Sequence, residues 1–237
     1  MTNLSEQTLA SIVRHNHQTV PILEKYDLDF CCKGKRTLQQ ACDEKGLALN
    51  KVLPELEGAT QTVSRSLPFE AMDPEQLISH IMIHHHFYVK QSMPTILSHL
   101  AKVVNKHGDR CPYMIEVQQL FTSIEKEMTN HMQAEETVLF PRIKEICASA
   151  KHSSAFEALY LSAPIDAMEA EHEKAGDSLY SIRQLTNNYT APEDACTTFT
   201  ICLAELKEFE EDLHQHVHLE NNLLFPLAEK IRSAVNA

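Results

Sequence analysis

The sequence predicts an all-α protein, built as a four-helix up-down-up-down bundle preceded by a small N-terminal helical domain. Between residues 74 and 234, apolar residues recur every three or four positions, which is the period of an amphipathic helix. Short polar turns separate these stretches, and short turns join antiparallel neighbours in a bundle. The composition agrees, because 43% of the 237 residues are hydrophobic, glycine occurs 5 times and tryptophan is absent.

Residues 1–58 are expected to form the small N-terminal domain. Its four short helices are expected to use Ser5, Pro21, Thr37 and Asn50 as starting residues, with Gly46 and Gly58 as stops. Between the second and third helices, residues 26–35 are interpreted as a turn that contains Cys31 and Cys32. The few apolar residues make a marginal core, so this domain is expected to be stabilised by packing against the larger domain or against a partner chain.

Residues 59–73 are polar and are interpreted as a linker, and residues 74–237 are expected to form the bundle. Asp73 is predicted to cap the first long helix, with Pro74 at its first position and Gln76 completing a capping box. Pro94 is expected to bend this helix. The first three long helices are expected at about 74–105, 112–148 and 164–187, and the fourth follows a turn at 188–192 and runs to about Ala234.

A short internal repeat dominates the second and fourth of these helices. Residues 131–141 (HMQAEETVLFP) and 216–226 (HVHLENNLLFP) lie 85 residues apart and share a histidine, a glutamate four residues later, and Leu-Phe-Pro. Positions i and i+4 share one helix face, so each pair can bind a metal ion together. The pairs are His131 with Glu135 and His216 with Glu220.

The apolar seam passes through both pairs and is expected to continue at Val138 and Leu223. An ionised carboxylate in such a seam is costly unless it is paired or binds metal. One isolated copy would be interpreted as a surface pair or a core histidine. Two copies, both in the seam and both before Leu-Phe-Pro, favour a metal site.

The other two long helices offer further histidines. His172 lies in the clean apolar seam of the third helix. The first helix contains His84, His85 and His86, and an apolar face through Ile78, Met82, Val89 and Ile96 places His85 near its middle and His86 at its flank. Periodicity therefore leans toward His85, but the bend at Pro94 weakens that inference.

One histidine from each helix and two glutamates make six ligands, too many for one zinc ion. They suit two metals bridged by carboxylates, and imidazole with carboxylate favours iron or manganese. A ferritin-like site needs Glu-x-x-His on two helices. Because only Glu169 with His172 offers that motif, a hemerythrin-like arrangement fits better.

The chain resembles the Repair of Iron Centers family, di-iron proteins that help to restore damaged iron–sulfur clusters. The resemblance covers nearly the whole chain and rests on residues 25–35 (KYDLDFCCKGK), the His131 motif, residues 169–176 (EAEHEKAG) and residues 216–226. In the family, the first-helix ligand lies eight residues before a proline, and this relation selects His86 because Pro94 follows it at that distance.

The resemblance implies a non-heme di-iron centre with two irons per chain, bridged by both glutamates and by an oxo or hydroxo group. Its ligands would be His86, His131, Glu135, His172, His216 and Glu220. Glu127 and Glu171 match acidic family positions beside the metal, although solvated surface charge is an equal alternative. The resemblance also implies a homodimer, a cytoplasmic location and induction under nitric oxide or peroxide stress.

Cys31 and Cys32 are candidates for redox handling, iron transfer or nitric oxide chemistry. Adjacent residues do not point the same way in a helix or a strand, and a disulfide between them would be strained and labile. The alternative is one buried thiol and one incidental thiol. The seven cysteines are odd in number and scattered, which favours a reducing cytoplasm over a secreted disulfide framework.

Charge and hydropathy exclude some partners. The net charge of −12 argues against nucleic acid or an anionic membrane, no apolar run approaches a membrane span, and the N-terminus has no signal-peptide pattern.

Three functions compete: restoration of damaged iron–sulfur client proteins by iron supply, reduction of nitric oxide or peroxide at the di-iron site, and gas carriage or sensing. The Cys-Cys unit counts against a plain carrier, which needs only the bundle.

Overall fold

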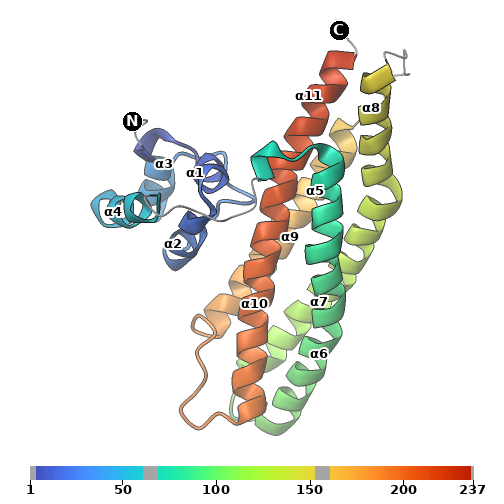
Figure 1. Cartoon of the computed structure of the whole chain (residues 1–237). Coiled ribbons are helices and arrows are strands. Elements are labelled where there is room, and N and C mark those ends of the chain that lie inside the picture. Colours follow the sequence, from blue (N-terminus) through green and yellow to red (C-terminus); the bar gives the residue numbers. More distant parts are fainter. Residues whose placement is uncertain (1–3, 61–68, 153–160, 236–237) are drawn as a thin grey trace.

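The computed structural model describes residues 4–60, 69–152 and 161–235, and long helices dominate it (Figure 1). Four helical segments form the predicted up-down-up-down bundle, which confirms the all-α fold. α6 packs against α7 and α10, and α7 packs against α9. The segments are α5 (Pro74–His80), η4 (Ile81–His86) and α6 (Phe87–His107); α7 (Tyr113–Ala134), η5 (Glu135–Leu139) and α8 (Phe140–His152); α9 (Ser162–Leu185); and α10 (Thr197–Leu219), η6 (Glu220–Leu224) and α11 (Phe225–Val235).

The start of the first segment follows the sequence prediction. The side chain of Asp73 accepts a hydrogen bond from the Gln76 backbone, the Gln76 side chain returns one to the Asp73 backbone, and Pro74 occupies the first turn. Within the described residues, no helix is long and apolar enough to cross a membrane.

Three of the four segments contain a wide π turn, which the sequence analysis did not foresee. In η4, η5 and η6 the closing bond spans five residues, from the N–H of Phe87, Phe140 and Phe225 to the carbonyls of Met82, Glu135 and Glu220. After η5 and η6, the closing phenylalanine is followed by a proline, Pro141 or Pro226, which has no N–H and clashes with the carbonyl four residues earlier in a regular helix. The wider turn relieves that conflict, and such turns often occur at functional sites.

The extra residue in each π turn shifts the apolar seam by one position. Met82 and Val138 were expected in the seam, but their side chains are 36% and 50% exposed. Leu223, also expected there, is only partly buried. The neighbouring apolar residue is buried in each case, namely Ile81, Leu139 and Leu224.

Two apolar cores fill the bundle, on either side of a layer of buried histidines and glutamates. The core nearer α8 and α11 contains Ile78, Phe140 and Phe225, and the other contains Phe121 and Phe209. Apolar seams predicted for α7, α9 and α10 are buried as expected. The polar layer is therefore enclosed by apolar side chains along the bundle axis.

The N-terminal unit consists of α1 (Leu9–His15), α2 (Val20–Lys25), α3 (Leu38–Glu44) and α4 (Leu49–Thr60). Thr37 caps α3 with a capping box, and Gly46 has a φ of +63°, as a helix stop requires. Two details differ from the prediction. Thr8 rather than Ser5 caps α1, and α4 begins before Asn50 and continues past Gly58.

The N-terminal unit lies against the α9–α10 side of the bundle (Figure 1). Its buried apolar residues belong to the same core as those of α6, α7, α9 and α10, the core that contains Phe121 and Phe209. Arg183 of α9 donates to Asp27 at 2.6 Å, and Nδ1 of His214 in α10 lies 3.3 Å from Glu24. Asn222 of η6 donates to the carbonyl oxygens of the turn that carries the cysteines. This docking places that turn beside the buried polar layer.

Candidate metal centre

The structure brings all six predicted ligands together in the polar layer between the two cores. Each is at most 2% exposed. Their ligand atoms form two groups, each within 4.8 Å: His86, His216, Glu135 and Glu220 in one, and His131, His172, Glu135 and Glu220 in the other. Both glutamates belong to both groups, which is the arrangement that two carboxylate-bridged metals require.

The oxygen atoms of each glutamate divide between the two groups. In Glu135, Oε2 lies 3.4 Å from Nε2 of His86 and Oε1 lies 3.3 Å from Nε2 of His131. In Glu220, Oε1 and Oε2 lie 3.2 Å from Nε2 of His216 and of His172, respectively. Each carboxylate thus offers one oxygen to each group.

Buried polar atoms without partners on four of the six side chains fit a metal centre. Within the described residues, Nε2 of His86, both nitrogens of His216 and all four carboxylate oxygens of Glu135 and Glu220 have no hydrogen-bond partner. Leaving one such atom unpaired costs about 1–3 kcal/mol, and more for a charged group. Cations bound among them would satisfy these atoms, and the imidazole and carboxylate donors suit iron or manganese.

Electrostatic interactions among these side chains support the same conclusion. Burial alone would lower the pKa of His131, but the carboxylates of Glu135, Glu220 and Glu171 outweigh it and raise that pKa to about 9. Burial would raise the pKa of Glu220, yet His216 and His172 hold it well below its usual range. The carboxylate of Glu220 therefore stays ionised and attracts positive charge, which protons or metal ions can supply.

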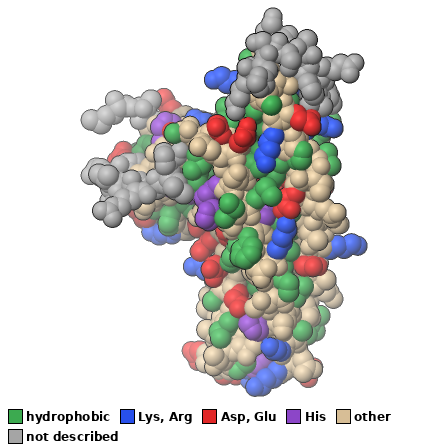
Figure 2. All heavy atoms as spheres, turned by 45° about the vertical axis from the view of Figure 1, so that its right-hand side comes forward, with side chains coloured by type: hydrophobic (Ala, Val, Ile, Leu, Met, Phe, Trp, Pro, Cys, Tyr) green, Lys and Arg blue, Asp and Glu red, His purple; other side chains and the backbone are tan. Residues whose placement is uncertain are grey.

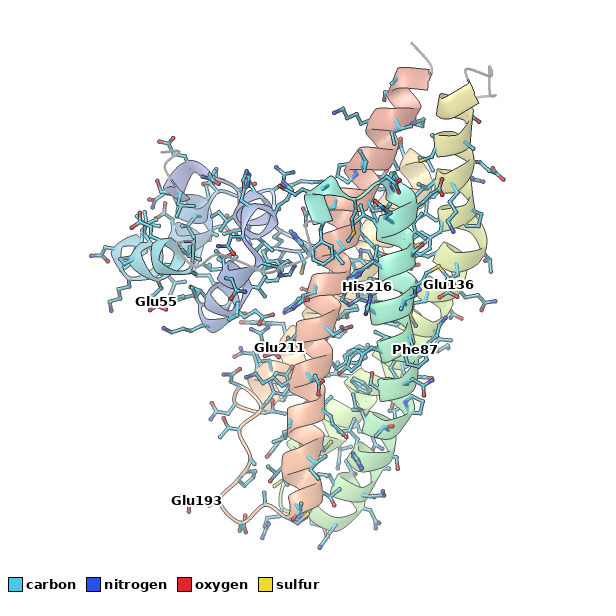
Figure 3. All side chains as sticks on the ribbon, viewed as in Figure 1. Glu55, Phe87, Glu136, Glu193, Glu211 and His216 are labelled. Atoms are coloured by element: carbon cyan, nitrogen blue, oxygen red, sulfur yellow. The ribbon has the colours of Figure 1, made fainter. Side chains whose placement is uncertain are left out.

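Three of the four histidines are oriented through their other ring nitrogen. Nδ1 of His86 donates to Glu136 at 2.7 Å, Nδ1 of His131 donates to Glu171 at 2.7 Å, and Nδ1 of His172 donates to the side-chain oxygen of Asn221 at 2.9 Å. Such bonds fix the tautomer and aim Nε2 at a metal. Figure 3 labels His216 in the bundle interior and Glu136 on the α7–α8 side.

His85 is buried but lies outside both ligand groups. Its Nδ1 donates to Asp212 at 2.9 Å, and its ring stacks nearly parallel on that of His216, with centroids 5.7 Å apart. His84 is exposed, as expected. The π turn η4 explains why periodicity leaned toward His85, because its extra residue rotates His86 into the seam.

The two acidic candidates occupy different environments. Glu171 is half exposed and binds the imidazole of His131, so it touches a predicted ligand. Glu127 instead pairs with Lys174 at 2.7 Å, and that hydrogen bond lowers the pKa of its carboxyl group. Glu127 lies on the bundle surface, one turn before His131.

Cys31 and Cys32 lie in a bend, neither helix nor strand, and their sulfur atoms are 3.8 Å apart as free thiols. The side chain of Asp29 accepts hydrogen bonds from the backbone of both cysteines. The neighbouring Cys32 thiol, with burial, raises the pKa of Cys31 well above its usual value. Cys32 is more accessible and lines a small pocket with Asn221, the residue that binds His172.

Sequence reasoning missed Glu136, Asn221 and the Asp212–His85 pair. A signal for the first two was present, because Glu136 and Asn221 are also 85 residues apart and each follows a predicted glutamate ligand. The internal repeat therefore extends by one functional position. In each copy that residue binds a histidine on a neighbouring segment.

Two family models match the chain. The Hemerythrin HHE cation binding domain matches residues 77–228, and a domain of unknown function (DUF542) matches residues 5–60. An iron-sulfur cluster repair protein YtfE from Cronobacter sakazakii is 32% identical over 223 residues, covering 94% of this chain and 96% of the relative. The proteins of the same name from Enterobacter sp. strain 638 and Escherichia coli O81 are 33% and 32% identical over 224 residues, with the same coverage.

Proposed function

The chain belongs to the family of iron-sulfur cluster repair proteins that contain a hemerythrin HHE domain, and from this we propose that it restores oxidatively or nitrosatively damaged clusters by supplying iron. Membership of this family implies that the chain binds iron. We propose further that it binds two iron ions in one centre. The observation that carries it is the division of the Glu135 and Glu220 oxygens between two groups of histidines.

In the proposed centre His86 and His216 hold one iron, His131 and His172 hold the other, and Glu135 and Glu220 bridge them. Bound there, iron would be the exchangeable cargo for a client cluster. The protein contributes a dry, enclosed layer, oriented imidazoles and negative charge. Two ferrous ions carry four positive charges, which the two bridging glutamates together with Glu136 and Glu171 can balance.

We also propose a role for Cys31 and Cys32 in passing iron, electrons or nitric oxide between the bundle and a client. Two observations support it. The cysteine turn is held to η6 by Asn222, directly after Asn221 in the chain. Cys32 shares a pocket with Asn221, which binds the ligand His172. Thiolates are good iron ligands, so a thiol at this place suits transfer to or from the centre.

The remaining parts of the proposal concern organisation. The division into residues 1–58, a linker at 59–73 and a bundle at 74–237 is supported by the separate family matches. A homodimer is supported by apolar side chains that are at least half exposed near the ligand groups, Ile83, Phe87 and Val138. A cytoplasmic location is supported by the free thiols of all seven cysteines.

The decisive experiment follows iron and client activity together. Iron-loaded protein is incubated anaerobically with an iron–sulfur enzyme inactivated by nitric oxide, and the iron of both proteins is measured while client activity returns. We expect two irons per chain at the start and a loss from this protein that matches the client's gain. His131→Leu, which removes a proposed ligand, is the matched control and should not restore activity.

Two results would contradict the proposal. Protein produced with ample iron that contains one zinc ion and no iron would refute the di-iron centre. Client recovery while this protein retains all its iron would refute iron supply and favour chemistry on nitric oxide at the centre.

A further inference from the structure

A row of histidine rings leads from the surface to the metal groups. The ring centroids of His84 and His80 are 4.3 Å apart, those of His80 and His85 are 5.7 Å apart, and His85 stacks on the ligand His216 at 5.7 Å. His84 is exposed, His80 is partly buried and His85 is 5% exposed. Histidine side chains are visible on the surface where the N-terminal unit meets the bundle (Figure 2). The row thus spans the protein from solvent to one half of the centre.

The outer pair of the row has the chemistry of a weak metal site. His80 and His84 are four residues apart in one helical segment, so both rings can approach one ion. Neutral imidazole is a good ligand for divalent first-row metals. Burial, with the nearby His84 and His85, lowers the pKa of His80 to about 4, so its ring is neutral at pH 7. Two imidazoles with water completing the coordination would bind an ion and release it readily.

The inner end of the row meets the least restrained ligand. Nδ1 of His86, His131 and His172 is held by a side chain, whereas Nδ1 of His216 is buried and has no hydrogen-bond partner within the described part of the chain. His85, stacked on His216, is held by Asp212, and the second carboxylate oxygen of Asp212 is buried with no hydrogen-bond partner among the described residues. An ion that leaves the His86–His216 half therefore has ligands in reach.

We propose that His80 and His84 form a transient site for a divalent iron ion, and that His84, His80 and His85 are the route by which iron enters and leaves the His86–His216 half of the centre. The route rests on the proposed function, because it needs exchangeable iron in that half. It makes the two irons unequal, because His85 contacts His216 of one half directly, whereas within the described residues neither His131 nor His172 forms a ring pair with His80, His84 or His85.

The test uses the full-length protein and separates equilibrium from rate. His84→Gln and the double variant His80→Gln/His84→Gln are loaded anaerobically with ferrous iron, and a ferrous chelator then removes it. We expect wild-type iron content in both, with the faster phase of removal slowed several-fold in the double variant. His99→Gln is the matched control, because His99 lies farther along the same segment and binds Glu205. It should release iron at the wild-type rate.

The possible results distinguish failure of the histidine route from failure of the proposed di-iron centre. Wild-type iron content with unchanged removal rates in the double variant would overturn the route and leave the di-iron centre intact. A wild-type chain that takes up no iron would refute the proposed function and the route with it. Reduced iron content in His84→Gln would also overturn the route, because it would make His84 a permanent ligand. If the double variant loses helix content, the single variant His84→Gln tests the route instead, since that side chain is exposed. Slower iron removal from His84→Gln than from the wild type would support the route, and an equal rate would overturn it.

Discussion

The carboxylate of Glu136 holds the imidazole of His86, with Oε1 of the glutamate 2.7 Å from Nδ1 of the histidine. Lys90 donates to the same oxygen at 2.6 Å. Asn221 occupies the equivalent place in the second repeat copy and holds His172. Each copy of the repeat therefore supplies a carboxylate shared by the two ligand groups and, at the next residue, a side chain that orients a histidine of a neighbouring segment.

Glu136→Gln should weaken iron binding without unfolding the bundle. The amide can still accept a hydrogen bond from His86, but the negative charge beside the imidazole is lost and Lys90 loses its counter-charge. Changes at such outer positions lower metal affinity by roughly 10- to 100-fold. Chelator competition measures the affinity, and Glu127→Gln is the control because Glu127 pairs with the exposed side chains of Ser123 and Lys174. Equal affinities in the two variants would show that the negative charge of Glu136 does not strengthen iron binding.

His86→Ala should perturb the di-iron absorption spectrum, whereas His84→Ala and His85→Ala should preserve it. Only His86 of the three belongs to a ligand group, and His85 is already bound to Asp212. The spectra of the three iron-loaded variants, recorded at equal protein concentration, distinguish them. Loss of the spectrum in His85→Ala alone would mean that helical periodicity, and not the family relation, identifies the ligand.

Much of the bundle was predictable because regular helices obey one period. The seam of α9, including Met168, His172 and Ala175, is buried as periodicity required. The repeat also pointed to the two glutamates that belong to both ligand groups, since a carboxylate in an apolar seam needs a partner. For the first segment, periodicity leaned toward His85 and only the family resemblance selected His86, which the structure places in one of the two ligand groups.

The π turns were not predictable from periodicity, for a physical reason. At each of them two apolar residues are adjacent, as in Val138 with Leu139 and Leu223 with Leu224, so either member could continue the seam. An inserted residue then leaves the pattern intact while it rotates everything that follows. Glu136 and Asn221 were missed for a related reason, because a polar residue beside the seam also suits a solvated face.

Arg183→Met should destabilise the fold by about 3–5 kcal/mol, because it leaves a buried carboxylate without its counter-charge. The side chains of Arg183 and Glu210 are 13% and 5% exposed, and Tyr189 also donates to Glu210. Arg183 binds Asp27 of the N-terminal unit as well, so docking of that unit should loosen. Denaturant unfolding followed by circular dichroism measures the free energy of unfolding.

The control for this change is Arg232→Met, which breaks the partly exposed pair of Arg232 with Glu229. Exposed pairs contribute at most about 1 kcal/mol, so this variant should unfold almost like the wild type. Similar losses of stability in the two variants would show that the buried ion pair of Arg183 with Glu210 contributes no more to the free energy of unfolding than an exposed pair does.

Replacing both Cys31 and Cys32 by serine should leave two irons bound and the bundle folded, while repair of a damaged cluster enzyme falls. The cysteines lie outside both ligand groups, and the backbone of their turn is held by Asp29 and Asn222 rather than by the thiols. Serine keeps the size and removes the soft iron ligand. Iron analysis, circular dichroism and recovery of client activity are measured on the same sample. Cys196→Ser is the control, since Cys196 caps the far end of α10. Full repair by the double-serine protein would show that the cysteines are dispensable and that the bundle restores clusters alone.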